Sequence, residues 1–524
     1  MYIGNSILSD EDRDNIQMFN ILMTGHISWH TYSQMRFAFQ HKMNIDSQYI
    51  IFQRIAKLSG VKSQFIDCCK NSCIAYTSKY VHFQSCPFCR EARFNQVGKP
   101  HRQFMYLPLI PQLRGYFQSV QMIQILSYRV DYDLRKGEVC DVFDGNLYQE
   151  LLRCRVVVDG EELSHQYFSD SRDIALGFCT DSYLLFRRQR KGPCGTPLLL
   201  QNYNLPPDVR TRSKNLLCVG IVPGPHQPKD LGSFLVPLDD ECAELAYGIQ
   251  TFNALQRALF KLHAYIILKS GDIVAIERFL NIKGHNSIFP CRSCKVKAIC
   301  GLGKTYYVPL HPPSQDREER ALYQAAPLRH HQDFLNTASI ISVANTKAMK
   351  TKIAKQTGIK GLPGLSRVGA LDYARASAWE WFHLFLENVV PNLVDFWTGQ
   401  FKGLGVGSED FEITPDIWQK VGEETAAAVR HIPSVFVHVL ANIATDRSLF
   451  TAESWSFWFV YLAPKLLEGR FPKQKYYRHM CELAEIMKVT LQLRVSHEQL
   501  NDIEGRIVEW VQKYERYSPH SVLS

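Results

Sequence analysis

Apolar runs alternate with polar segments between about residues 170 and 280. Three of these runs, IALGFCT, PLLLQNYNL and LLCVGIVPG, predict short buried strands. The longer segment that follows them, ECAELAYGIQTFNALQRALFKLHAYIIL, predicts a helical stretch. The alternation of strand and helix patterns indicates an α/β core.

The regions on either side have different patterns. Residues 1–66 are polar and helical in pattern, with SDEDRDN as a helix start, and residues 100–165 mix strand and helix signals around the apolar run FMYLPLIPQL. Residues 281–365 have the character of an insertion, because they combine a cysteine pair, a proline-rich bend (PLHPPS), a charged run (QDREER) and the basic stretch NTKAMKTKIAKQTGIKG. From residue 371 onward the pattern is mainly helical.

Composition narrows the class of protein. The chain has 524 residues, 46% of them hydrophobic and 21% charged, which is ordinary for a globular protein of several domains. Its formal net charge of +9 is compatible with a polyanionic partner. The most apolar helix candidate, residues 379–397, contains Glu380, His383, Glu387 and Asp395, so we expect no membrane span. We also expect no targeting signal at the N-terminus.

Fifteen cysteines occur without a secretion signal, which favours free thiols and metal ligands over disulfides. Cys69 and Cys73 form one local pair, and Cys86 and Cys89 form another in the turn CPFC. Four thiolates in two such pairs predict a tetrahedral structural zinc site, with Cys68 as a rival for Cys69. The alternative is a set of buried free cysteines, which behave as small hydrophobic residues.

A second pair, Cys291 and Cys294, lies in GHNSIFPCRSC. A single CxxC pair is a weak metal signal, and its remaining ligands stay open among His285, Cys300 and His311.

Three acidic residues stand in settings typical of a metal-dependent phosphoryl-transfer site. Asp181 and Asp230 follow the apolar runs of two predicted strands, and Glu387 lies inside an apolar helix. Buried carboxylates usually have a partner, and two divalent ions about 4 Å apart are one such partner. We therefore expect the three carboxylates within roughly 10 Å of one another. Taken singly, Asp181 fits a turn, Asp230 a loop or helix cap, and Glu387 an ion pair with a base.

Many segments in one order resemble the transposases of CACTA (En/Spm-type) DNA elements, in particular the fungal branch. The resemblance is carried by DCCKNSCIAYTSKY, CPFCREAR, FMYLPLIPQL, ALGFCTDSY, QNYNLPPDVR, IVPGPHQPKDLGSFLVPL, HAYIILKSGDI, GHNSIFPCRSC, YYVPL, WFHLFLENVVPNLVDFWTGQFKG and FTAESWSFWFVYLAP. It implies a ribonuclease-H-like catalytic domain with a DDE/D metal site, split by an insertion before the last acid. On this resemblance Asp181 is the first metal ligand, Asp230 the second and Glu387 the third, with His383 as a neighbouring candidate. The family commonly has glycine after the first aspartate, where this chain has Ser182.

The predicted fold is therefore mixed α+β with helical regions. Its predicted parts are a helical N-terminal segment (residues 1–66), a zinc-binding module (67–95) and a connecting α/β region (96–165). They continue with the first part of the ribonuclease-H-like core (166–280), an insertion (281–365), a catalytic helix completing the core (366–400) and a helical C-terminal region (401–524).

The function that the resemblance implies is metal-dependent cleavage of DNA strands and their transfer at transposon ends. Oxygen ligands favour Mg²⁺ or Mn²⁺ for catalysis, beside structural Zn²⁺. The expected partners are double-stranded DNA and the terminal repeats of the element, with a homo-oligomer as a further expectation and the nucleus as the location. The basic segment 186–192 and the lysines of the insertion are candidate phosphate contacts. The alternatives are a non-catalytic DNA- or protein-binding derivative and a structure-specific nuclease.

Overall fold

The chain divides into two compact units. The computed structural model describes residues 2–3, 6–134, 137–184, 194–300, 306–308, 326–401, 407, 409–437 and 439–517. Unit 1 comprises residues 1–132, 147–269 and 363–372, and unit 2 comprises residues 133–146, 270–362 and 373–524. The seven predicted segments are finer than these two units, and their limits stay predictions.

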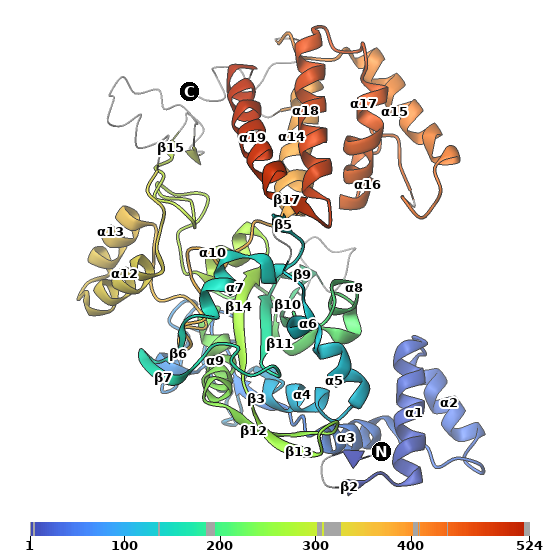
Figure 1. Cartoon of the computed structure of the whole chain (residues 1–524), viewed down its shortest axis with the longest axis vertical. Helices are drawn as coiled ribbons and strands as arrows, with labels where there is room; N and C mark the ends of the chain where they lie inside the picture. Colours follow the sequence, from blue (N-terminus) through green and yellow to red (C-terminus); the bar gives the residue numbers. More distant parts are fainter. Residues whose placement is uncertain are drawn as a thin grey trace. The chain divides into compact units, whose positions relative to one another are not determined.

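A seven-stranded sheet forms the centre of unit 1 (Figure 1). Its strands are ordered β14-β8-β10-β11-β4-β3, with the short β9 also paired to β10. Antiparallel pairing joins β10 to both β8 and β11. In chain order these strands are β3 (Gln64–Asp67), β4 (Gln103–Tyr106), β8 (Ile174–Cys179), β9 (Tyr183–Leu184), β10 (Cys194–Asn202), β11 (Leu217–Pro223) and β14 (Ala264–Ser270).

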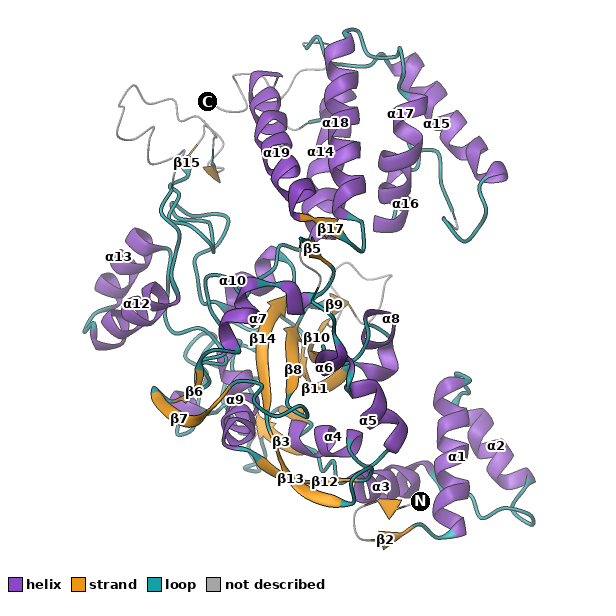
Figure 2. Ribbon diagram, in the orientation of Figure 1, coloured by secondary structure: helices purple, strands orange, loops and turns teal. Residues whose placement is uncertain are grey.

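The neighbouring strands β8 and β14 run in the same direction (Figure 2). The amide of Ile174, where β8 begins, donates to the carbonyl of His263, immediately before β14, at 3.0 Å. This contact joins the beginnings of the two strands, so their carboxyl ends lie at the same edge of the sheet. Both strands are almost entirely buried, as expected for parallel neighbours covered on both faces.

Helix α9 (Gly232–Tyr247) follows β11 and packs on the sheet through the rings of Phe234 and Phe104, whose centroids are 5.4 Å apart. Glu241 of α9 accepts hydrogen bonds from the amides of Leu109 (2.7 Å) and Ile110 (2.9 Å) and from the hydroxyl of Tyr106. A carboxylate that satisfies the first amides of a helix stabilises that helix. This contact fixes α4 (Leu109–Tyr116) against α9.

The predicted strands IALGFCT, PLLLQNYNL and LLCVGIVPG are confirmed as β8, β10 and β11. The predicted helical stretch after them is wrong beyond Tyr247. Helix α9 ends at Gly248, whose φ of +96° favours glycine, and the chain continues as the hairpin of β12 (Ile249–Asn253) and β13 (Ala258–Leu262), then as β14. A continuous apolar run such as AYIIL suits a strand buried on both faces as well as a buried helix.

Unit 1 also contains further helices and short strands. They are β1 (Tyr2–Ile3), β2 (Ser6–Ile7), α1 (Asp10–Thr24), α2 (Trp29–Ala38), α3 (Gln48–Ser59), η1 (Ser78–Tyr80), α5 (Val120–Leu126), α6 (Tyr128–Asp131), β6 (Arg155–Val158), β7 (Glu161–Gln166), α8 (Pro207–Arg210) and η3 (Ser213–Asn215). Helix α7 (Asn146–Leu151) begins at the border of the two units.

Unit 2 is mainly helical. Its core is built from the apolar faces of helices after residue 380, with Trp458 completely buried and its indole N–H donating to Thr425 at 3.0 Å. These helices are η4 (Phe382–Val389), α14 (Val390–Trp397), α15 (Pro415–Ala428), η5 (Val429–His431), η6 (Arg447–Leu449), α16 (Ala452–Phe457), η7 (Trp458–Leu462), α17 (Ala463–Leu466), α18 (Gln474–Thr490) and α19 (His497–Tyr517).

The earlier part of unit 2 contains α10 (Ile273–Phe279) and the pair α12 (His331–Val343) and α13 (Lys347–Thr357). Its short elements are β5 (Glu138–Val139), η2 (Val142–Asp144), β15 (Ile299–Cys300), β16 (Tyr306–Tyr307) and β17 (Val495–Ser496), which pairs with β5. Among the described residues no helix combines the length and apolar character that a bilayer crossing requires.

Candidate metal centres

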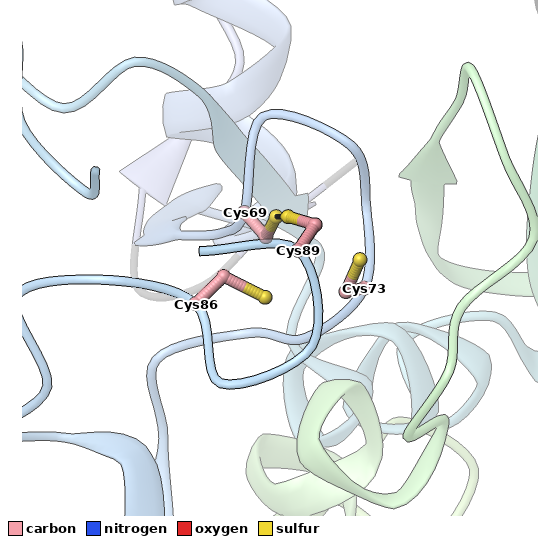
Figure 3. A group of neighbouring side chains, drawn as sticks. All are labelled: Cys69, Cys73, Cys86 and Cys89. Atoms are coloured by element: carbon pink, nitrogen blue, oxygen red, sulfur yellow. Dashed lines mark hydrogen bonds between the residues drawn. The ribbon is translucent and has the colours of Figure 1, made fainter. Parts of the chain in front are cut away.

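Four cysteine sulfurs of unit 1 converge as a potential metal site (Figure 3). The ligand atoms of Cys69, Cys73, Cys86 and Cys89 all lie within 4.8 Å of one another, and the sulfurs of Cys69 and Cys89 are 3.4 Å apart. Sulfurs bound to one tetrahedral zinc at about 2.3 Å are about 4 Å apart, so the group fits such an ion. The neighbouring Cys68 is buried but is not part of this group, which resolves the rivalry in favour of Cys69.

A tight turn brings the two cysteines of each pair close to each other. The amide of Ser72, at a φ of +61°, donates to the carbonyl of Cys69 at 2.8 Å, and the amide of Arg90, at a φ of +63°, donates to the carbonyl of Cys86 at 2.8 Å. Both turns thus return the chain within four residues, which lets two sulfurs of each pair face one point. We call residues 67–95 the cysteine module.

The thiols of the module differ in acidity. Burial raises the pKa of Cys69 to about 11 and also raises the pKa of Cys73. Burial would likewise raise the pKa of Cys89, but hydrogen bonds from the Glu91 backbone and from Cys69 outweigh it and lower this pKa to about 7. Because a metal binds thiolates, an incoming ion must displace the protons of Cys69 and Cys73, so metal affinity should rise with pH.

The cysteine module docks on the segment between β11 and α9. The carbonyl of Cys73 accepts from the amides of Lys229 (3.0 Å) and Asp230 (3.1 Å), and Ser72 donates through its hydroxyl to the carbonyl of Gly224 at 2.6 Å. The amide of Ala75 donates to the hydroxyl of Ser233 at 3.0 Å. The module is therefore continuous with the main sheet and its first helix.

Asp230, the predicted second metal ligand, belongs to this docking contact. Its Oδ2 accepts from the Tyr80 hydroxyl at 2.9 Å and lies 3.0 Å from the Lys79 ammonium, while its Oδ1 accepts from the amide of Ser233 at 3.3 Å. It does not directly follow a strand, because β11 ends at Pro223. These contacts place Asp230 in the loop just before α9, which is one of the two alternatives named for it above.

Asp230→Ala should weaken this docking. Tyr80 is 7% exposed, so its hydroxyl would lose its partner in a buried place, and the amide of Ser233 would lose an acceptor. We expect a loss of about 1–3 kcal/mol in local stability, most of it from Tyr80, since Lys79 is largely exposed and its ion pair contributes little. Hydrogen exchange of peptides covering residues 73–80 and 230–235 measures it. Unchanged exchange in both peptides would contradict the docking role.

Asp181 lies two residues beyond the end of β8, with its side chain exposed. Its neighbours hold this segment against β10, because Thr180 donates through its hydroxyl to the carbonyl of Pro197 at 2.8 Å and the hydroxyls of Ser182 and Thr196 are 2.6 Å apart. Ser182, which stands where the resembled family has glycine, therefore directs its side chain to β10.

Asp272 is an acid that the sequence analysis did not select. It lies two residues beyond the end of β14, as Asp181 does beyond β8, and these two strands are parallel neighbours. It caps α10, with its Oδ1 accepting from the amide of Ala275 at 2.5 Å. The sequence contains a signal for it, the apolar run followed by an acid in AYIILKSGD, but such a run fits a buried helix as well as a buried strand.

Glu387 lies on η4 in unit 2, beside His383 and Glu380. The Nε2 of His383 is 3.6 Å from Oε2 of Glu387, and its Nδ1 contacts Oε2 of Glu380. Burial would lower the pKa of His383, but the hydrogen bond with Glu380 and the charges of Glu387, Glu380 and Asp272 outweigh burial and raise it. Asp272 and Glu387 therefore act on the same imidazole. The wide turns of η4 are π-helical, a distortion frequent at functional sites.

The expectation of buried carboxylates is wrong for Asp181 and Glu387, whereas Asp230 is partly buried. The side chain of Glu387 is 60% exposed and that of Asp230 is 22% exposed. Exposed acids need no buried partner, and they remain open to a ligand as large as DNA. The three predicted ligands also lie in different units, with Asp181 and Asp230 in unit 1 and Glu387 in unit 2.

The pair Cys291 and Cys294 forms a compact turn in unit 2. The sulfur of Cys291 accepts from the amides of Ser293 and Cys294, both at 3.3 Å, and the Arg329 Nε donates to the carbonyl of Cys291 at 3.0 Å. Contact with Cys294 lowers the pKa of Cys291 to about 6. No third ligand joins this pair among the described side chains, and His285 contacts Glu277 at 2.7 Å.

Several predicted residues lie outside the described residues. These are the basic segment from residue 186 to 192, His311 and the side chain of Cys300.

Comparison with known families points to one class of protein. Residues 158–310 match the model described as "Transposase family tnp2". The match includes β8 with Asp181, β14 with Asp272 and the pair Cys291 and Cys294, and it shows that the chain is a transposase-like protein. No curated protein matches the chain.

Proposed function

We propose that this transposase-like protein cuts DNA strands and transfers them at the ends of a DNA transposon of the CACTA type. The observation that carries the proposal is the pair of parallel neighbouring strands β8 and β14, each followed two residues later by an aspartate, within the family match. Acids after neighbouring parallel strands stand at the sheet edge where α/β proteins bind their ligands. The sheet would be the ribonuclease-H-like core that the resemblance implies.

The proposed catalytic acids are Asp181, Asp272 and Glu387. Their carboxylates offer only oxygen ligands, which suit Mg²⁺ or Mn²⁺ better than zinc. When bound, two such ions would activate the attacking water or 3′-hydroxyl and stabilise the leaving oxygen. His383, placed between Glu380 and Glu387, would position the Glu387 carboxylate.

Asp230 leaves the proposed set because its carboxylate is already bonded to Tyr80, Lys79 and Ser233. Its proposed role is to hold the cysteine module, with its structural zinc, against α9. The proposed partner is double-stranded DNA carrying terminal repeats. The nucleus as the location, and a homo-oligomer that pairs two ends, follow from that partner.

A nicking assay tests the proposal. The purified chain is incubated with supercoiled DNA carrying the element's terminal repeats, with Mg²⁺, Mn²⁺ or a chelator. We expect nicked and strand-transferred products only with a divalent ion. Products that form equally in the chelator would contradict the proposal. Tight binding of the repeats without any nicking would instead favour the non-catalytic derivative, and nicking without strand transfer would favour the nuclease.

A further inference from the structure

The helices α12 and α13 form a pair with a short, well-defined connection. Only residues 344–346 separate them. Thr346 caps α13 by accepting from the amide of Met349 at 3.1 Å, and Ala344 is buried. Two helices joined by a turn of three or four residues are the framework of DNA-binding helix–turn–helix elements.

The pair is anchored on its inner side within unit 2. Helix α12 buries Phe334, Thr337, Ala338 and Ile341, and the ring of Tyr373 stacks on His331 with centroids 4.6 Å apart. Helix α12 is thus the supporting helix of the pair.

The C-terminal end of α13 is also held firmly. The Arg329 Nη2 donates to the carbonyl of Thr357 at 2.9 Å, and the amide of Lys283 donates to the carbonyl of Gly358 at 2.7 Å. Gly358 ends the helix at a φ of +79°, and a Cβ there would lie 2.6 Å from the carbonyl oxygen of Phe289. This anchoring gives α13 a fixed direction while most of its length remains uncovered.

The outer face of α13 is basic and exposed. Ala354 is its single buried residue, and at about 100° per residue the opposite face contains Ala348, Met349, Lys352 and Gln356, with Lys355 at its border, all exposed. Lys347 and Lys350, near the N-terminal end, are exposed too, although they lie on the same side of the helix as Ala354. None of the four lysines forms an ion pair with a described residue. The one acid of the two helices, Asp333, is paired with Lys295 at 3.0 Å.

We propose that α13 lies in the major groove of duplex DNA and that α12 supports it. The inference rests on the proposed function only in taking DNA as the partner. A helix of 11 residues is about 16 Å long, and the major groove, about 12 Å wide, admits one helix. Four unpaired lysines on an acid-free helix complement the phosphates on both sides of the groove. Lys352 and Gln356, near the centre of the outer face, are side chains that can bond base edges.

The test uses the full chain and two matched variants. The first replaces Lys347, Lys350, Lys352 and Lys355 by alanine, which favours helix and preserves α13. The control replaces four other exposed lysines outside ion pairs with described residues, Lys57, Lys62, Lys420 and Lys465. Both variants lose the same charge, so a difference between them reports the place of the lysines. Far-ultraviolet circular dichroism confirms folding.

We expect the α13 variant to bind duplex DNA about 100- to 1000-fold more weakly, with the slope of log affinity against log salt reduced by roughly three. The control should change affinity less than about fivefold. In dimethyl sulfate footprints the wild type should protect guanine N7, in the major groove, and the α13 variant should lose that protection.

Three results would overturn the inference. The first is an equal weakening of DNA binding in both variants, and the second is guanine N7 protection that persists in the α13 variant. The third is a loss of polyglutamate binding by the α13 variant as large as its loss of DNA binding, which would indicate an acidic protein surface as the partner instead. The nicking assay keeps the two proposals apart. Wild type that binds as expected without nicking contradicts the proposed function alone, and normal nicking and footprints by the α13 variant contradict the α13 inference alone.

Discussion

Asp181→Asn and Asp272→Asn should each reduce DNA nicking by at least about 100-fold while duplex binding stays within about threefold. Each change removes a charged metal ligand without altering side-chain size. Loss of groups that merely support metal ligands already costs about 10- to 100-fold, so loss of a ligand should cost at least that much. Nicking rates and DNA affinity, measured on the same preparations at saturating Mn²⁺, give the comparison. Glu387→Gln should behave in the same way.

Asp230→Asn is the control that distinguishes the proposed set of acids, which contains Asp272, from the set predicted by sequence, which contains Asp230. Asparagine keeps one oxygen that can accept from the Ser233 amide, and its NH2 group can donate to the Tyr80 hydroxyl oxygen, so the docking of the cysteine module should be largely preserved. We expect nicking within about fivefold of the wild type, since no metal ligand is lost. Loss of nicking in Asp230→Asn together with full activity in Asp272→Asn would contradict the revised set and restore the original one.

The strands of the central sheet were predictable where an apolar run was short and clearly bounded. Strands β8, β10 and β11 met that condition. Strand β14 did not, because its run AYIILKS follows the hairpin of β12 and β13 and merges with it into one long apolar segment. Burial on both faces removes the alternation of polar and apolar residues that identifies a half-buried strand.

The acids were harder to predict than the strands. Asp230 was chosen because it follows an apolar run, but its partners Lys79 and Tyr80 are 151 and 150 residues away in the chain. No local pattern reveals such contacts. Asp272 follows strand β14, whose apolar sequence also fits a helix. The two cases differ in origin, because Asp230 depends on contacts from a distant part of the chain, whereas Asp272 depends on the assignment of the strand before it.

The cysteine group was predictable because its information is local. Two pairs with gaps of three and two residues, separated by a short segment, determine the ligand set before any long-range contact is known. The choice between Cys68 and Cys69 was different, since adjacent residues share the same spacing. It depends on which of the two side chains turns toward Cys86 and Cys89, and the spacing does not reveal that direction.

Cys86→Ser should remove one zinc ion per chain and destabilise the cysteine module by several kcal/mol. A structural zinc site in a small module contributes an apparent binding free energy of about 10–16 kcal/mol near neutral pH, and losing one of four thiolates forfeits much of it. The effect should extend to the start of α9, because Ser72, Cys73 and Ala75 bond that segment. Zinc content by elemental analysis and hydrogen exchange over residues 67–95 and 217–235 measure both parts.

Cys68→Ala supplies the matched control, since Cys68 is buried next to the site but lies outside the group of four. It should keep the zinc content of the wild type and change exchange only near residue 68, because it removes a small apolar group and no ligand. The zinc of the wild type should also be released as the pH falls, since protons then compete for the thiolates of Cys69 and Cys73, whose pKa values are raised by burial. A wild type without zinc would show that the four sulfurs hold no ion, and the cohesion of the module would then rest on its buried residues Ile74, Tyr76 and Tyr80.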